Sequence, residues 1–331
     1  MKPARVRLPT RGSVLVILAI AGCDRQPSPP PPAPVPAVEV APPAAAPACN
    51  LAPIALRMPM PKRAVAIGDL HGDLAATRAA LRAAGAIASP ANAGRAASPE
   101  AMRSAIDESD HWIGNDLVVI QTGDVLDRGG GESAILQLLE RLDGEARAHG
   151  GALIELLGNH ELMNAAGDFR YVTPDGMHDF DGDRAHELGP GGRWAKRLAT
   201  HNAIAIVGDN VLSHAGVTES WMTKLDQTNL EARCWLDGDI ATPASALTGE
   251  DSPVWTRAYG GDDVDCAALG RVLKQLGAKR MIVAHTVQKA GINSQCDGAL
   301  WRIDVGMTAM IGGPIQVLEL GDPPKIINGS R

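Results

Sequence analysis

The sequence predicts a layered α/β fold in which two mixed β-sheets are flanked by helices. From about residue 62, short apolar runs alternate with longer amphipathic segments, which is the pattern of a layered α/β domain. After residue 203 the connections between apolar runs become shorter, which indicates a second and more mixed sheet. A chain of 331 residues that is 45% hydrophobic is long enough to bury the core of such a fold.

Residues 1–22 resemble a lipoprotein signal peptide. Four basic residues precede the apolar run VLVILAIAG, which is too short to span a bilayer but fits the core of a signal peptide. The run ends in IAGC, which resembles the site where bacterial lipoproteins are cleaved before a cysteine that becomes lipidated. We therefore expect lipidation at Cys23 and a membrane-anchored protein that faces the periplasm.

Residues 23–62 predict an extended tether. Thirteen of the chain's 24 prolines lie between Asp24 and Pro61, mixed with alanine and valine. Proline removes backbone donors and favours the extended polyproline conformation, so this composition indicates a semi-rigid spacer. A ligand for a proline-binding module is the alternative. The folded domain is expected to occupy residues 63–331.

Eight apolar runs predict strands and four amphipathic segments predict helices. Strands are expected at 64–68, 117–123, 152–158, 203–208, 210–216, 280–285, 300–306 and 314–320. Helices are expected at 74–84, 132–149, 193–201 and 266–276. Segments 85–116 and 174–192 are rich in Gly, Asp and Ala and predict surface insertions. The stretch DFDGDRAHEL in the second lacks the closing glutamate of an EF-hand loop, so we expect a solvated loop.

Charge and cysteine content narrow the class of protein. The net charge of −7 becomes more negative once the basic leader is removed, so binding of nucleic acid is not expected. Besides Cys23, the chain has Cys49, Cys234, Cys266 and Cys296, which allow two disulfides in any of three pairings in an exported protein. Cys266 and Cys296 flank one predicted strand, which favours that pair. Four free buried thiols are the alternative.

Polar side chains that bind metals or phosphate follow five of the predicted strands. In chain order they are Asp69 with His71, Asp124 with Asp127 and Arg128, Asn159 with His160, then His214, and then His285. Ligands gather beyond the carboxyl ends of strands in α/β folds, so these loops can meet in one cleft. For the first loop alone, a solvated turn in which Asp73 caps the next helix explains the residues equally well. Five such loops in one chain favour a shared site.

The residue types in these loops point to phosphate chemistry on a metal centre. The loops offer oxygen and nitrogen ligands and no thiolate, which is sufficient for two cations that share a carboxylate. The candidate ligands are Asp69, His71, Asp124, Asn159, His214 and His285. Two such cations can activate a water as hydroxide for in-line attack on phosphorus. Arg128 and Arg257 can each offer a planar fork to phosphate oxygens, although Arg257 is also explained as a surface residue. His160 can protonate the departing oxygen while Asp127 orients it.

The motifs GDLHGD, GDVLDRG, GNHE, SHAG and AHTVQ, in this order, resemble those of the calcineurin-like metallophosphoesterases, and especially of their phosphoprotein phosphatase branch. The longer runs QTGDVLDRGGGESAILQLLERL and LLGNHELMNAAGDFRYV are similar to the Shewanella-like protein phosphatases within it. The match spans nearly everything from Ala64 to Leu320. It implies the calcineurin-like sandwich of two mixed β-sheets.

The resemblance also implies roles for individual residues. The first metal would be held by Asp69, His71 and Asp124, and the second by Asp124, Asn159, His214 and His285. His160 would be the acid and Asp127 its partner, and the substrate phosphate would be bound by Arg128, Arg257 and Asn159. Many relatives end in a GHxH motif, but this chain has AHTV at 284–287, so the first metal lacks one histidine, as in the protein phosphatase branch. Manganese, iron and zinc all fit such ligands.

The function that the resemblance implies is a binuclear metal-dependent phosphomonoesterase, and a protein phosphatase is the first expectation. Its substrate would be a phosphorylated protein or a small phosphate. One alternative is a nucleotide or dinucleotide polyphosphate hydrolase on the same fold. The other is a catalytically silent lipoprotein that binds a partner. The choice between phosphotyrosine and phosphoserine or phosphothreonine stays open.

Overall fold

Two mixed β-sheets form the centre of the domain, as the sequence predicts, in the residues that the computed structural model describes, namely 49, 51–89, 110–241 and 248–331. The five-stranded sheet has the order β11-β10-β2-β3-β4, and the six-stranded sheet has the order β1-β5-β6-β7-β9-β8. One core contains residues from both, including Val65 and Ile120 from the first and Ile206 and Leu212 from the second. The predicted signal peptide and Cys23 lie outside the described residues.

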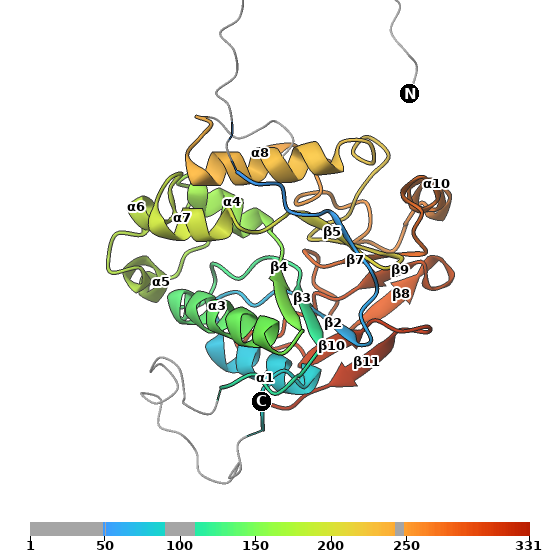
Figure 1. Ribbon diagram of the computed structural model, residues 1–331, viewed down its shortest axis with the longest axis horizontal. Helices are drawn as coiled ribbons and strands as arrows, with labels where there is room; N and C mark the ends of the chain where they lie inside the picture. Colours follow the sequence, from blue (N-terminus) through green and yellow to red (C-terminus); the bar gives the residue numbers. More distant parts are fainter. Residues whose placement is uncertain (1–48, 50, 90–109, 242–247) are drawn as a thin grey trace, which may run out of the picture. The chain divides into compact units, whose positions relative to one another are not determined.

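The five-stranded sheet is built around three parallel strands, β2 (Ala64–Ile67), β3 (Val118–Gln121) and β4 (Ala152–Glu155). The antiparallel strands β10 (Gln316–Glu319) and β11 (Lys325–Asn328) complete it. Figure 1 shows the helices α1 (Leu74–Ala84) and α3 (Glu132–Ala148) beside this sheet. Its register aligns Ile67, Gln121 and Glu155, so the three segments that follow leave at one edge.

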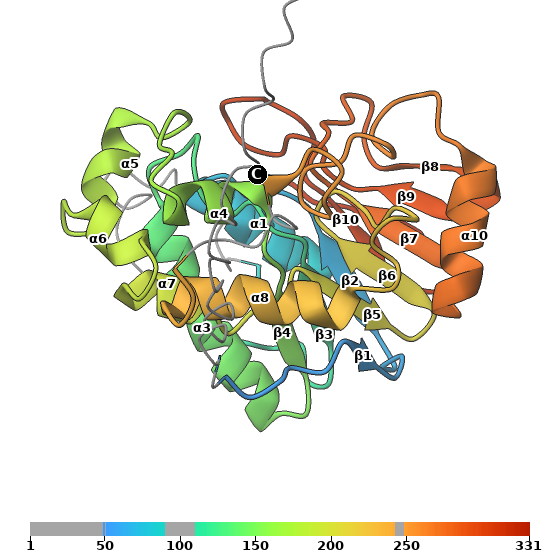
Figure 2. The same ribbon diagram turned by 90° about the horizontal axis from the view of Figure 1, so that it is seen from above.

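The six-stranded sheet has a similar alignment at its own carboxyl edge. It contains β1 (Arg57–Met58), β5 (Ile204–Val207), β6 (Asn210–Ser213), β7 (Arg280–Val283), β8 (Asn293–Gln295) and β9 (Leu300–Arg302). Strands β6, β7 and β9 are parallel, and Leu212 pairs with Ile282, which pairs with Trp301. Figure 2 shows helix α10 (Cys266–Leu276) beside β7, β8 and β9. The expected second, mixed sheet is therefore present, but β10 joins the first sheet instead.

Segment 174–192 lies largely at the surface, as its composition predicts, but it is not an irregular insertion. It forms the helices α5 (Pro174–Asp179) and α6 (Arg184–Leu188), and α7 (Arg193–Leu198) follows directly. Phe180, Arg184 and Leu188 are buried. Asp183, one of the polar residues that suggested a solvated loop, begins a helix instead, because its side chain accepts a hydrogen bond from the backbone amide of His186 in the first turn of α6.

The last part of the predicted tether belongs to the folded domain. Strand β1 pairs in parallel with β5, and Leu51, Leu56 and Met58 pack against the core. Cys49 forms a disulfide with Cys234, in helix α8 (Leu225–Asp237). The folded domain thus begins well before the predicted boundary at residue 62, because apolar side chains between the prolines supply a short edge strand.

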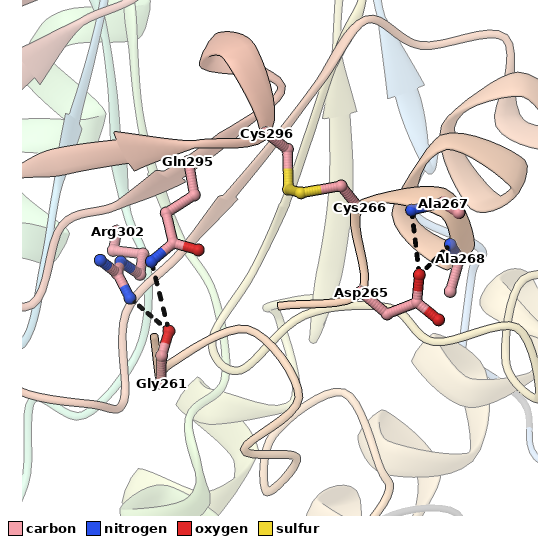
Figure 3. Close-up of a disulfide and its surroundings, with 8 residues drawn as sticks. All are labelled: Gly261, Asp265, Cys266, Ala267, Ala268, Gln295, Cys296 and Arg302. Carbon is pink, nitrogen blue, oxygen red and sulfur yellow. Dashed lines mark hydrogen bonds between the residues drawn. A yellow bond between two sulfur atoms is a disulfide. The ribbon is translucent and has the colours of Figure 1, made fainter. Parts of the chain in front are cut away.

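Both disulfides close within this domain. Cys266, the first residue of α10, is bonded to Cys296, which is the pairing that the sequence favours, and Figure 3 shows this bond. In the same view Asp265 accepts hydrogen bonds from the amides of Ala267 and Ala268 and so caps the helix. None of the described helices is both long and apolar enough to cross a bilayer.

Candidate metal centre

The loops that follow β2 and β3 bring three predicted ligands together. His71 Nε2 lies 3.7 Å from Asp69 Oδ2 and also 3.7 Å from Asp124 Oδ2. Asp124 is the centre of the cluster, because its carboxylate also lies close to His214, a predicted ligand from the other sheet. All three side chains are buried.

The loops after β6 and β7 approach Asp124 from the six-stranded sheet. His214 Nε2 lies 3.2 Å from Asp124 Oδ2, 3.0 Å from Asn159 Oδ1 and 3.1 Å from His285 Nδ1. The six predicted metal ligands thus form one connected cluster at the meeting edges of the two sheets. Two triplets of side chains have their ligand atoms within 4.8 Å of one another. Asp124–His214–His285 consists of predicted ligands, whereas His71–Asp124–His160 includes His160, which the sequence predicts as the acid.

The chemistry of these side chains fits divalent cations. The Nδ1 atoms of His71 and His214 are hydrogen-bonded to the backbone carbonyls of Leu126 and Thr122, at 2.9 and 3.0 Å, which leaves Nε2 directed at the cluster. Among the described residues, Asp69 Oδ1 and His285 Nε2 are buried and have no hydrogen-bond partner. Such orphaned acceptors are costly unless a cation or another donor binds them.

The protonation states of two imidazoles also suit metal binding. Burial lowers the pKa of His71 to about 4 and that of His285 to about 3. Both rings are therefore neutral near pH 7 and can offer a nitrogen lone pair to a cation. Burial, followed by the charges of Asp304 and Asp124, raises the pKa of Asp69. A cation at this place would reverse that shift because it favours the ionised carboxylate.

The backbone is strained where it carries the site. Nine described non-glycine residues have a positive φ, and five of them, at 43° to 69°, are His71, Asp124, Asp127, Arg128 and His285. Left-handed conformations cost free energy in such residues and persist only where the surroundings impose them. The sharp turns after the strands thus aim these side chains into the cluster.

Glu161 holds the turn that carries Asp124. Its buried carboxylate accepts hydrogen bonds from the amides of Asp124, Val125, Leu126 and Gly158, at 2.7 to 3.1 Å. The backbone amide of His160, at the start of α4 (Asn159–Ala165), donates to Asp124 Oδ1 at 3.0 Å. The first turn of α4 therefore orients the shared carboxylate, a role for Glu161 that the sequence analysis did not identify.

His160 and Asp127 form a buried pair beside the cluster. His160 Nδ1 lies 2.5 Å from Asp127 Oδ2, and its Nε2 lies 3.7 Å from Asp124 Oδ2. Burial alone would lower the pKa of His160, but Asp124 and the hydrogen bond to Asp127 outweigh it and raise the pKa. A protonated imidazole is favoured, and its Nε2 faces the candidate metal centre.

The two predicted arginines flank the centre from different loops. Arg128 Nη2 lies 3.3 Å from His160 Nε2, and the guanidinium lies over the ring of Tyr171, 5.6 Å from its centroid. Arg257 is exposed and donates to Thr286 Oγ1 at 3.0 Å, directly after His285. Asp73 does not join the cluster; as the alternative reading expects, it caps α1 by accepting from Ala76 N.

The loop after His285 lines one side of an open cavity of about 590 Å³. Its lining includes Val287 and Gln288, which follow His285 in the chain, together with Gly260, Gly261 and Arg302. Arg302 donates to the carbonyl oxygens of both glycines and so closes one wall. Figure 3 shows its hydrogen bond to Gly261 beside the Cys266–Cys296 disulfide. The cavity offers mostly polar backbone and side-chain groups to a bound molecule.

Comparison with known proteins agrees with this geometry. The model of the family described as calcineurin-like phosphoesterase matches residues 62–289. Shewanella-like protein phosphatase 2 of Arabidopsis thaliana is 37% identical over 318 residues, which cover 80% of this chain and 76% of the relative. The solved cold-active protein-tyrosine phosphatase of a psychrophilic Shewanella species has the same fold, with a TM-score of 0.67, 22% identity and 83% of each chain covered.

Proposed function

Because the chain belongs to the calcineurin-like phosphoesterase family, and is thus a metal-dependent phosphoester hydrolase, we propose that it removes phosphate from phosphorylated proteins and holds two divalent cations. One observation carries the proposal. Asp124 belongs to the cluster of metal-ligand side chains, and its carboxylate also lies 3.7 Å from the imidazole of His160, which is paired with Asp127. Cation binding and proton donation can then act on one phosphoryl group.

The ligands of the two cations are proposed from their place in the cluster. Asp69, His71 and Asp124 would hold the first cation, and Asp124, Asn159, His214 and His285 the second. Divalent cations at such a site supply Lewis acidity, since they lower the pKa of water and neutralise negative charge on phosphoryl oxygens. Manganese, iron and zinc all accept these ligands.

The remaining residues would bind the phosphate and assist the leaving group. Arg128 and Arg257, with the Asn159 amide, would donate hydrogen bonds to phosphoryl oxygens. His160 would transfer its Nε2 proton to the ester oxygen as the bond between that oxygen and phosphorus breaks. Asp127 would accept the Nδ1 hydrogen bond throughout and so keep the ring in place.

Protein substrates are favoured by similarity and by space. The relative with 37% identity is named a protein phosphatase, and the cavity beyond His285 could take the residues next to a phosphorylated side chain. A phosphopeptide panel with tyrosine, serine and threonine, run beside dinucleotide polyphosphates with added Mn²⁺ and with chelator, tests the proposal. Turnover of phosphopeptides that the chelator abolishes is expected. Preference for dinucleotides would overturn the protein substrate.

Removal of single ligands tests the metal centre itself. Asp124→Asn and His214→Ala are expected to lower turnover of p-nitrophenyl phosphate by about 100-fold or more, because even outer partners of metal ligands contribute about 10- to 100-fold. The matched control is His149→Ala, since His149 is exposed and its imidazole Nδ1 is bonded to the backbone carbonyl of Glu145. Full turnover in both ligand variants would exclude the centre, and empty sites in the metal-reconstituted parent protein would favour a non-catalytic binding role.

Membrane anchoring at Cys23 is a separate part of the proposal. It is supported by the leader-like residues 1–22 and by the IAGC sequence. The full chain expressed in a bacterium should partition into the detergent phase, and Cys23→Ala should move it to the aqueous phase. Equal partitioning of the two proteins would exclude lipidation at this cysteine.

A further inference from the structure

Arg184 lies behind the His160–Asp127 pair, in the segment whose composition suggested a solvated loop. It is 1% exposed. Its Nη2 donates to Asp127 Oδ1 at 3.1 Å, while Asp127 Oδ2 contacts His160 Nδ1 at 2.5 Å. The carboxylate of Asp127 is therefore held between the imidazole and the guanidinium, with one oxygen on each.

The guanidinium has an acceptor for each of its five N–H bonds. Nε donates to Asn164 Oδ1 at 2.7 Å, and Nη1 donates to the Gly176 carbonyl at 3.0 Å and to Glu132. Nη2 donates to Asp127 and, at 3.2 Å, to Glu132 Oε1. Because every donor is occupied, the plane of the fork is fixed by four separate residues. An arginine held in this way can fix the rotamer of the carboxylate that it contacts.

A second path joins the same groups. The Asn164 side chain donates to Asp127 Oδ1 at 2.8 Å and to the carbonyl of His160 at 2.9 Å, while accepting from Arg184. Glu132 also accepts a hydrogen bond from the backbone amide of Asp127. Asp127 is thereby fixed through both its backbone and its side chain by groups that contact Arg184.

The cost of burial argues that this network has a role beyond stability. A buried arginine between two carboxylates loses hydration, and apolar side chains of similar volume stabilise a core as well or better. We propose that Arg184 is a positioning residue for leaving-group protonation, because it fixes Asp127 and thereby aims His160 Nε2 at the ester oxygen. This inference rests on the proposed role of His160 as the acid.

The test compares two leaving groups on the manganese-loaded full-length protein. Phenyl phosphate releases a basic phenolate that needs a proton, whereas 2,4-dinitrophenyl phosphate releases an anion that does not. Arg184→Lys and Arg184→Gln should lower kcat for phenyl phosphate by about 10- to 100-fold and for dinitrophenyl phosphate by less than about threefold, as expected of an outer partner of a catalytic group. Bound manganese, measured on the same samples, should be unchanged.

Control variants separate this role from folding. Arg78 is also buried, and its Nε donates to Asp110 Oδ2 at 2.6 Å. Because Arg78 belongs to α1, Arg78→Gln should change kcat for both substrates by the same factor. If Arg184→Gln fails to fold, the double variant Arg184→Met with Glu132→Gln removes the unpaired charge and is measured instead.

The outcomes are distinguishable. His160→Asn should show the same dependence on the leaving group as the Arg184 variants. Equal loss on both substrates, or no loss, in the Arg184 variants would overturn the inference while His160→Asn still discriminates. If His160→Asn does not discriminate, the acid role in the proposed function fails, and the inference fails with it.

Discussion

At the scale of single residues, the position of the shared Asp124 carboxylate depends on the absence of a side chain at Gly158. A Cβ atom at Gly158 would lie 2.2 Å from Asp124 Oδ1, closer than any non-bonded contact allows. Gly158→Ala should displace this carboxylate and lower both manganese affinity and kcat by about 10- to 100-fold, the range for groups that orient metal ligands. Manganese titration followed by calorimetry, with turnover of p-nitrophenyl phosphate, measures both effects.

Gly144 provides the matched control for this substitution. It lies within α3, and apart from the backbone of that helix no atom of the described residues would come within 4 Å of an added Cβ. Gly144→Ala should leave activity unchanged and stabilise the protein by about 0.5–1 kcal/mol, because alanine loses less backbone entropy in a helix. Equal activity of the two alanine variants would show that the position of Asp124 does not depend on Gly158.

The residues that the sequence could reveal are those attached to strand ends. Asp69, Asp124 and His214 follow apolar runs directly, so local pattern is enough to place them at one edge. Arg184 is different, because its contact with Asp127 joins residues 57 apart in the chain. Its own neighbours are glycine, aspartate and alanine, which indicate only a turn. Such partners become visible only when the fold is known.

At the scale of elements, strong periodicity explains which predictions are confirmed. Helices α1 and α10 have the predicted bounds, because their apolar residues recur without interruption and aspartates cap them. Helix α8 was missed because buried polar residues break its apolar face. One of them, Asn229, accepts hydrogen bonds from the amides of Ala203 and Ile204, which precede or begin β5. The Asn229 side chain thus bonds a neighbouring strand, whereas the hydrophobic pattern predicts that a polar residue lies on the exposed face of the helix.

The contact between β4 and α7 predicts a pH-dependent stability. Burial raises the pKa of Glu155, at the end of β4, to about 7, although its ion pair with Arg197 opposes the shift. The folded state therefore keeps a proton that the unfolded state releases above pH 4.5, and the free energy of unfolding falls as pH rises toward 7. Below pH 4.5 this contribution is complete.

Glu155→Gln should remove this dependence. The free energy of unfolding of the variant, measured relative to the parent protein, should rise by up to about 3 kcal/mol from pH 5 to pH 8, since one pKa unit corresponds to about 1.4 kcal/mol. Urea unfolding of both proteins at the two pH values measures the difference. Glu140→Gln is the control, because Glu140 lies 3.5 Å from the same arginine but is exposed. A parallel pH response of the Glu155→Gln variant and the parent would contradict the assignment.

At the scale of the whole domain, the site exists because two sheets end at the same place. The first sheet delivers Asp69, Asp124 and Asn159, and the second delivers His214 and His285. The sequence predicts that these loops meet in one cleft, but it does not show how the edges of the two sheets come into contact, because that contact depends on the shared core. Local pattern cannot predict that β10 and β11 return to the first sheet, since β2, the partner of β10, precedes it by about 250 residues in the chain.

The disulfide between Cys49 and Cys234 ties the first described residue to α8 and closes a span of 185 residues, whereas Cys266–Cys296 closes 30. In the chain-entropy account, loops of these lengths contribute about 5 and about 3.5 kcal/mol, respectively. Replacing Cys49 and Cys234 together by serine should therefore destabilise the protein by about 1.5 kcal/mol more than replacing Cys266 and Cys296. Urea unfolding of the metal-loaded proteins compares them. The reverse order would mean that the segment around β1 unfolds locally, so that its disulfide does not constrain the global transition.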